Sequence, residues 1–180
     1  MDRRLMLARR DDVIAAWNRH DADAIVEHVA DDVIVRDIAL GMPLLGRSAL
    51  RDASSTYIQA FPDVHVEITS STAEGPRIVQ EWTVTGTHRG AFMGIAPTGR
   101  WTQTYGVTVT TFDEDGVMIE ASMYWNPLAM LHQLGVADQP GATVATTISP
   151  SSAATATTDR AARAPHSGGA STRNSSPLAT

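Results

Sequence analysis

The stretch RIVQEWTVTGTHRGAFMGIAPTGRWTQTYGVTVTTF, residues 77–112, decides the fold of this chain. Its two ends, 77–88 and 100–112, are rich in β-branched and aromatic residues, which is typical of long strands. The segment 86–100 between them holds four glycines and one proline, and these residues favour tight turns. The stretch therefore predicts two neighbouring long strands joined by a glycine-rich connection.

Helices and further strands are predicted on both sides of this pair. Apolar residues recur at helical spacing in 11–29, with a break at Asp21, and again from Ser48 to Phe61. Other segments have the pattern of strands or of a closing helix: strands at 31–38, 64–74 and 117–125, and a helix at 126–136 that ends near Gly135. This order predicts an α+β fold: a cone-shaped, curved antiparallel sheet wrapped by N-terminal helices, with a closing C-terminal helix. The open end of such a cone is a natural place for an apolar pocket.

Composition divides the chain and limits its function. We expect one domain at residues 1–136, because 33 of the 44 residues in 137–180 are Ala, Thr, Ser, Pro or Gly, a composition typical of a disordered tail. The net charge of −6 argues against a nucleic-acid-binding protein. The start of the chain lacks the apolar region of a secretory signal, and no apolar run is long enough to cross a membrane. We therefore expect a cytoplasmic protein without membrane contact.

Alternation along the strands assigns side chains to faces. Trp82 and His88 share one face with Ile78, Gln80 and Val84, and this face is the better candidate for the interior. Gln103 and Tyr105 share a face of the next strand, and Asp37 shares a face with Val33 and Val35. The prediction places His88 near the mouth of the cone.

Four segments together resemble the SnoaL-like polyketide cyclase family, within the nuclear-transport-factor-2-like folds. They are AAWNRHDADAI (15–25), VRDIALGMPLLGRSALRD (35–52), GTHRGAFMGIAPTGR (86–100) and YWNPLAMLHQLG (124–135). The resemblance covers roughly residues 10–136. It implies a homodimer formed through the outer face of the sheet and a hydrophobic small-molecule substrate held in the cone. It also places 86–100 as a crossover at the rim, with Phe92 and Met93 pointing inward as lid residues.

The resemblance also implies a chemistry. In characterised cyclases of this family, an aspartate on the last strand works with a histidine on the preceding strand. The carboxylate removes a proton next to carbonyl groups, and the enolate closes a ring by aldol attack without metal or cofactor. In this chain the aspartate position falls on Met123 and the histidine position on Thr108. The chain thus departs from the cyclase pattern at its catalytic pair.

Other residues are therefore the candidates for chemistry. We predict Asp37 and His88 as the catalytic pair, because a carboxylate and an imidazole can transfer protons near neutral pH. Each also has a structural alternative, as a turn-forming aspartate or a loop-ordering histidine. The predicted substrate-binding residues are Trp82, Phe92, Met93, Gln103, Tyr105, Met123 and Tyr124. The six histidines show no metal-ligand spacing, so neither a metal nor a cofactor is expected.

Two functions remain open at this level. The first is a cofactor-independent enzyme of polyketide or other secondary metabolism, such as antibiotic biosynthesis, that acts on an aromatic or polyketide-like substrate. Cyclisation, including ester cyclisation, isomerisation and hydroxylation all belong to it. The second is a non-catalytic module of the same fold that binds a small molecule or assembles as a dimer.

Overall fold

Four helices and six strands make up residues 2–137, which are the residues that the computed structural model describes. The tail predicted at 137–180 lies outside the described residues, except for Ala137. The helices are α1 (Arg3–Asn18), α2 (Ala22–Ile25), α3 (Arg47–Ala60) and α4 (Pro127–Leu134). The strands are β1 (Val29–Asp37), β2 (Pro43–Leu45), β3 (His65–Glu74), β4 (Arg77–Thr87), β5 (Trp101–Phe112) and β6 (Met118–Trp125).

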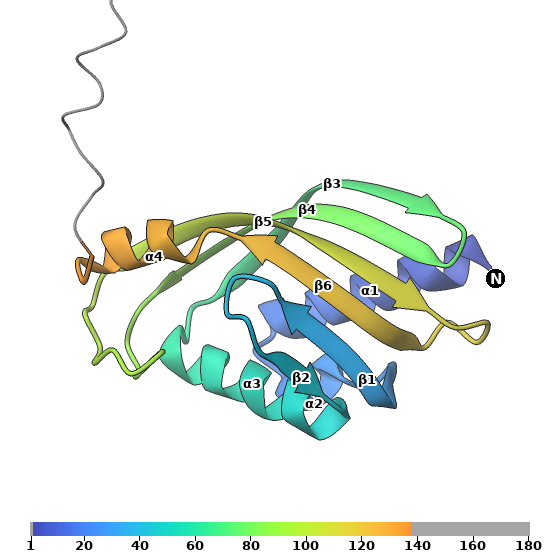
Figure 1. The fold of residues 1–180 in the computed structure, drawn as a ribbon, viewed down its shortest axis with the longest axis horizontal. Helices are drawn as coiled ribbons and strands as arrows, with labels where there is room; N and C mark the ends of the chain where they lie inside the picture. The colour runs from blue at the N-terminus through green and yellow to red at the C-terminus, as the bar shows by residue number, and fades with distance from the viewer. Residues whose placement is uncertain (1, 138–180) are drawn as a thin grey trace, which may run out of the picture. The chain divides into compact units, whose positions relative to one another are not determined.

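The strands form one open sheet in the order β2-β1-β6-β5-β4-β3, as Figure 1 shows. The strands β3 to β6 are joined as antiparallel neighbours, as predicted. The connection 86–100 is accordingly a hairpin loop between β4 and β5, and the predicted crossover is wrong. The sheet is also not antiparallel throughout, because β1 pairs with β6 in parallel. The α+β fold with a curved sheet is confirmed, while the short strand β2 was not predicted.

Local sequence signals explain most helix boundaries. Asp2 accepts a hydrogen bond from the Arg4 amide, so α1 begins well before the predicted start at residue 11. The helix α3 begins at Arg47, after Gly46, whose φ of +88° suits glycine, and so starts one residue before the predicted Ser48. At the end of the domain, Asn126 caps α4 and Gly135 closes it in the left-handed conformation.

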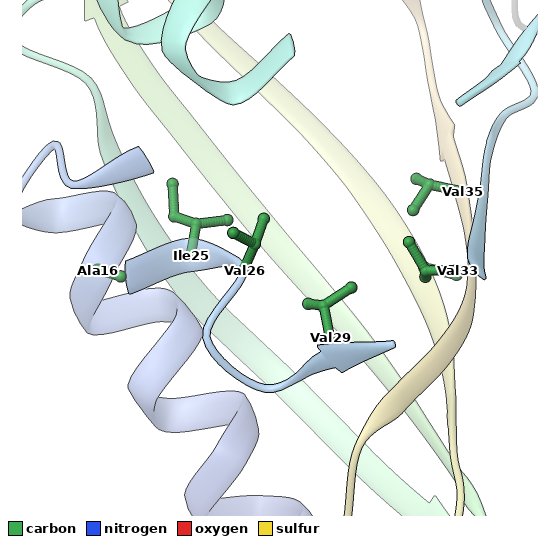
Figure 2. Close-up of a cluster of buried hydrophobic side chains, with 7 residues drawn as sticks. Ala16, Ile25, Val26, Val29, Val33 and Val35 are labelled. Atoms are coloured by element: carbon green, nitrogen blue, oxygen red, sulfur yellow. The ribbon is translucent and has the colours of Figure 1, made fainter. Parts of the chain in front are cut away.

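The helices pack against one face of the sheet, here called the inner face. A cluster of seven buried residues joins α1 and α2 to β1 and β6: Ala16, Ile25, Val26, Val29, Val33, Val35 and Ala121 (Figure 2). A second cluster, around Phe61 and Met130, joins α3 to α4. A third, around Met6 and Ile78, lies against the start of α1. Each fully buried large apolar side chain contributes about 1.5–3 kcal/mol, so these clusters anchor the helices on the inner face.

Candidate functional site

A row of four paired residues crosses the inner face of the sheet. Asp37 on β1 is in register with Met123 on β6, Met123 with Thr108 on β5, and Thr108 with Gln80 on β4. We call these four residues the inner row. Met123 and Thr108, where the resemblance expects the aspartate and the histidine, are thus direct neighbours. The only carboxylate of the inner row is that of Asp37, on β1, which is the strand next to the one that carries Met123.

Asp37 lies half-buried at the end of β1, and its carboxylate is held by three N–H donors. The indole Nε1 of Trp125 donates to Oδ1 at 3.0 Å and to Oδ2 at 3.1 Å. The backbone amides of Ala39 and Leu40 donate to Oδ1 at 3.0 and 3.3 Å. Oδ1 therefore receives three hydrogen bonds and Oδ2 only one, which leaves Oδ2 as the oxygen that is free to accept a proton.

Two indole rings lie beside the inner row. Trp82, Gly106 and Trp125 form a second set of paired residues, two positions further along β4, β5 and β6. The Nε1 of Trp82 donates to the Thr108 hydroxyl at 2.9 Å, just as that of Trp125 donates to Asp37. A Cβ at Gly106 would lie 2.3 Å from the Trp82 ring, so the absence of a side chain at Gly106 lets this indole lie over β5.

The strand β5 brings only small side chains to the inner face before Phe112. These are Thr102, Thr104, Gly106, Thr108 and Thr110, and all four threonines are buried. Apolar clusters border this region, but no large side chain of β5 fills it. The centre of the inner face therefore carries threonine side chains and the two indole rings, and the apolar clusters surround it.

An exposed apolar segment follows Asp37 directly. Ile38 is 50% exposed, Leu40 44% and Met42 77%. A single exposed apolar residue is common on protein surfaces. Three large exposed apolar side chains next to the hydrogen-bonded carboxylate of Asp37 favour contact with an apolar molecule. Sequence reasoning did not select this segment, Trp125 or Gln80 as site residues. Alternation had already placed Gln80 on the interior face of its strand, and along β6 it puts Trp125 on the same face as Met123, which was selected.

His88 lies at the end of β4 and is fully buried, not at an open mouth. The Thr98 amide donates to its Nδ1 at 3.3 Å, so the proton of the neutral ring is on Nε2. Nε2 is buried without a hydrogen-bond partner, and the ring centroid lies 5.3 Å from that of Phe61. Burial lowers the pKa of His88. In this structure His88 orders the base of the loop.

The two predicted catalytic residues do not meet. The inner row contains Asp37 and, on β4, Gln80. His88 is eight residues beyond Gln80, which corresponds to roughly 26 Å of strand at about 3.3 Å per residue. Asp37 and His88 thus belong to different parts of the inner face, and the structure does not bring them together as one acid–base pair.

The predicted lid residues differ in their placement. Phe92 packs edge-on against Tyr57 and Phe61, with ring centroids 5.3 and 5.4 Å apart. Met93 sits at the tip of the small turn that Phe92 and Ile95 close, with a φ of +52°, and is 47% exposed. Phe92 therefore points inward as predicted, whereas Met93 points out to solvent.

Three of the predicted substrate-binding residues lie on the opposite, outer face. Gln103 and Tyr105 alternate with the buried threonines of β5, and Tyr124 alternates with Met123 on β6. Tyr105 is 63% exposed and Tyr124 49%. The backbone of Gln103 exchanges two hydrogen bonds with the side chain of Gln133, which fastens α4 to β5. This register places Gln103, Tyr105 and Tyr124 on the face opposite to Asp37, whereas Trp82 and Met123 are on the same face as Asp37.

Neither of two hollows found among the described residues is lined by a residue of the inner row. One, of about 320 Å³, is lined mainly from the outer face by Thr69, Glu81, Trp82, Tyr105, Gly106 and Val107. The other, of about 310 Å³, lies at α1 and α2 and is lined by Arg9, Asp12, Arg19, Ala24, Glu27 and His28. Within residues 2–137, no three acidic or histidine side chains gather as metal ligands. In the same part of the chain, no helix has the length and apolar character needed to span a membrane.

The comparisons with known proteins agree with this architecture. The model of the family described as SnoaL-like polyketide cyclase matches residues 8–134. The chain belongs to the SnoaL-like polyketide cyclase family. No curated protein matches it at the level of sequence.

Solved structures of similar fold include relatives of this family. AclR from Streptomyces galilaeus, described as "a putative hydroxylase", is 28% identical, with a TM-score of 0.68 over 78% of this chain and 87% of its own. TsrD from Streptomyces laurentii is 19% identical, with a TM-score of 0.68 over 76% of this chain and 99% of its own. IdmH from Streptomyces antibioticus, described as "a putative polyketide cyclase", is 22% identical, with a TM-score of 0.63 over 73% of this chain and 99% of its own. Family and neighbours support, in general, an enzyme of secondary metabolism.

Proposed function

We propose that this member of the SnoaL-like family is a cofactor-independent enzyme that moves protons on an aromatic or polyketide-like substrate, with Asp37 as its base. The observation that carries the proposal is the position of Asp37 on the inner row, with three hydrogen bonds on carboxylate oxygen Oδ1 and only one on Oδ2. A carboxylate fixed in this way needs no rearrangement before it accepts a proton.

The proposed reaction begins at a C–H bond next to a carbonyl group. Oδ2 of Asp37 takes the proton, and the electron pair of the C–H bond becomes an enolate. The Thr108 hydroxyl accepts from Trp82, so its own hydrogen remains free to donate to the enolate oxygen. In a cyclisation, the enolate carbon then attacks a second carbonyl carbon, and the Asp37 carboxyl returns its proton to the new alkoxide.

Isomerisation and hydroxylation would share this first step. In an isomerisation the proton returns to a different carbon. In a hydroxylation the carbanion adds to molecular oxygen and takes up a proton to give a hydroperoxide, and an external reductant then supplies two electrons and two protons that cleave the O–O bond and leave the hydroxyl group and water. The similarity to AclR, at 28% identity, favours including hydroxylation among the outcomes. Enolate formation at Asp37 is the step that all three reactions have in common.

A non-catalytic binding module is the second candidate. It is favoured by Met123 and Thr108, which pair on the inner face at the positions where the resemblance expects acid–base residues. In that case the indoles of Trp82 and Trp125 would hold a planar apolar molecule, and Asp37 would serve only to fix Trp125.

Exchange of hydrogen for deuterium separates the two candidates without knowledge of the product. The probe is 1-(naphthalen-2-yl)propan-2-one in D₂O, whose CH₂ group between the aromatic ring and the carbonyl is followed by NMR. We expect the protein to accelerate exchange, and Asp37→Asn to reduce the acceleration by about 100-fold or more. Asp32→Asn is the matched control, because Asp32 is an exposed aspartate on the same strand.

Two outcomes would contradict the enzyme. If Asp37→Asn exchanges the probe as fast as the unchanged protein, Asp37 is not the base. If the probe quenches tryptophan fluorescence but its exchange is never accelerated, the binding module is the better description.

A further inference from the structure

The polar hollow of about 310 Å³ at α1 and α2 takes no part in the proposed reaction. Its lining consists of one alanine and five charged or titratable side chains: Arg9, Asp12, Arg19, Ala24, Glu27 and His28. Small-molecule sites in proteins span roughly 300–1,000 Å³, so this hollow has room for a small ligand. The charged lining favours a ligand that is itself charged.

The turn after α1 brings the two sides of the hollow together. Arg9, Asp12 and the C-cap residue Arg19 lie on one side of α1, at helical positions i, i+3 and i+10. The backbone of His20, with a φ of +59°, turns the chain at this point, and the residues that follow run beside α1 (Figure 2). Arg9 and His28 are therefore in contact, although they are 19 positions apart in the chain.

Three of the lining residues satisfy one another. Nη1 of Arg9 lies 2.6 Å from Nε2 of His28 and donates to it, because a guanidinium has donors only. The imidazole is therefore neutral, with its proton on Nδ1. The carboxylate of Asp12 lies 4.0 Å from Nη1 of Arg9 and 3.6 Å from Nε2 of His28, so it balances the charge of the guanidinium.

Arg19 and Glu27 are outside this network. Both residues are exposed, and neither has an ion-pair partner within residues 2–137. They do not pair with each other either, although both line the hollow. One positive and one negative group thus face the same space without neutralising each other. A single unpaired charge on a surface is ordinary, but two opposite charges around one hollow match a ligand that carries both.

We propose that this hollow binds a small zwitterion, of the chemical class of the free amino acids. Its carboxylate pairs with the guanidinium of Arg19, which can donate two parallel hydrogen bonds, and its ammonium group donates to the carboxylate of Glu27. A simple anion is repelled by Glu27 and a simple cation by Arg19, so only a ligand with both charges gains from both residues. The inference does not depend on the proposed reaction at Asp37.

The test uses three zwitterions and two probes with a single charge. Glycine, 4-aminobutanoate and 6-aminohexanoate separate the ammonium and the carboxylate by an increasing number of carbons, whereas butanoate and butylamine each carry one of the two groups. Binding to the full chain is followed by the NMR shifts of the Ala24 and His28 amides, near neutral pH and at low ionic strength, because salt screens exposed charges. We expect at least one zwitterion to bind about tenfold more tightly than either single-charge probe.

Substitutions at the two unpaired residues test their roles separately. Arg19→Gln and Glu27→Gln should each raise the Kd of that zwitterion about tenfold, to the level of a single-charge probe. Both residues are exposed, so the fold should remain intact. Arg4→Gln and Glu67→Gln are the matched controls, because they remove the same charges at exposed positions of α1 and β3 and should leave the Kd unchanged.

An exchange of the two charges completes the test. The double variant Arg19→Glu with Glu27→Arg should restore the preference for the zwitterion, which then binds in the reverse direction. Local damage to the structure would not be repaired by a second substitution, so this rescue separates ligand recognition from a structural role.

The proposal is overturned by any of three findings. The zwitterions bind no more tightly than butanoate and butylamine, the control variants weaken binding as much as Arg19→Gln does, or the exchange of charges fails to restore the preference. Tighter binding of butanoate than of every zwitterion would assign the hollow to anions instead.

Discussion

The indole nitrogen of Trp125 donates to both carboxylate oxygens of Asp37, at 3.0 and 3.1 Å, although the residues are 88 positions apart in the chain. The contact closes the parallel pairing of β1 and β6 at the point where Asp37 meets Met123. It adds to the hydrogen bonds that the Ala39 and Leu40 amides donate to Oδ1 from the residues that follow β1. The carboxylate of the proposed base is thus held both by β6 and by the residues that follow β1.

Trp125→Phe should lower the rate of proton exchange about tenfold while leaving the KM nearly unchanged. The ring remains to pack, but the carboxylate loses its only donor from β6, and Oδ2 loses its only hydrogen bond, so the Ala39 and Leu40 amides alone hold the group through Oδ1. The measurement is the initial rate of exchange of 1-(naphthalen-2-yl)propan-2-one over a range of concentrations, which separates kcat from KM.

Trp101→Phe is the matched control for this change, because Trp101 is 57% exposed on the outer face. It should alter neither constant. A rise in KM without a fall in kcat for Trp125→Phe would instead indicate that Trp125 contacts the substrate and does not position Asp37.

Gly106→Ala should destabilise the domain by about 1–3 kcal/mol, the usual range for overpacking. The new Cβ would lie 2.3 Å from the Trp82 ring and 2.7 Å from the Tyr124 carbonyl oxygen. The measurement is urea unfolding followed by circular dichroism.

A double-mutant cycle identifies the cause of this loss. In a Trp82→Phe background the same glycine substitution should cost less, because the indole atoms nearest the new Cβ are gone. An equal cost in both backgrounds would assign the whole effect to the Tyr124 carbonyl.

The strand β4 shows how much of this site the sequence can predict. Alternation correctly placed Ile78, Gln80, Trp82 and His88 on the inner face, because large apolar residues mark that side of the strand. On β5 the same reasoning selected the wrong face. On β5 the threonines are buried, while Trp101 and Tyr105 are exposed. The large aromatic side chains of this strand therefore lie on the outer face and not on the inner one.

Pairings between distant segments were beyond local pattern reasoning. The sequences of 29–37 and 118–125 do not indicate that these two strands are parallel neighbours. Their pairing depends on the packing of α1 and α2 against the inner face. The contact between Trp125 and Asp37 follows from this pairing and could not be predicted without it. His88 was selected for its chemistry, but its burial depends on Phe61 and on the folded loop 86–100.

The outer face leads to a prediction about assembly. Tyr105, Tyr124, Trp101 and Val79 expose apolar surface there, between 41% and 63% for each residue. We expect two copies of the chain to pair through this face, since a surface with several exposed aromatic residues is typical of an interface. Light scattering at micromolar concentration should give the mass of a dimer.

Tyr105→Glu should shift the mass toward that of a monomer, because it buries a charge in the interface. Gln59→Glu, on the exposed side of α3, is the matched control and should leave the dimer intact. A monomeric mass for the unchanged protein would contradict the prediction.

His88 predicts a dependence of stability on pH. Burial lowers its pKa in the folded protein, because the charged imidazolium is poorly solvated there, while the unfolded chain takes up the proton near the ordinary value of about 6.5. Between the two values the unfolded state binds more protons, so stability falls as the pH falls below about 6.5. Above about pH 8 the ring is neutral in both states and its contribution no longer changes.

The measurement is the free energy of unfolding at several values between pH 5 and pH 8 for three proteins. His88→Gln should show a shallower loss on the acid side than the unchanged protein, by less than about 1.4 kcal/mol per pH unit, the limit for one proton. His65→Gln should leave the slope unchanged, because His65 is exposed at the start of β3. Parallel curves for His88→Gln and the unchanged protein would mean that His88 takes up a proton as readily in the folded protein as in the unfolded chain, and that the loop over it opens before the domain unfolds.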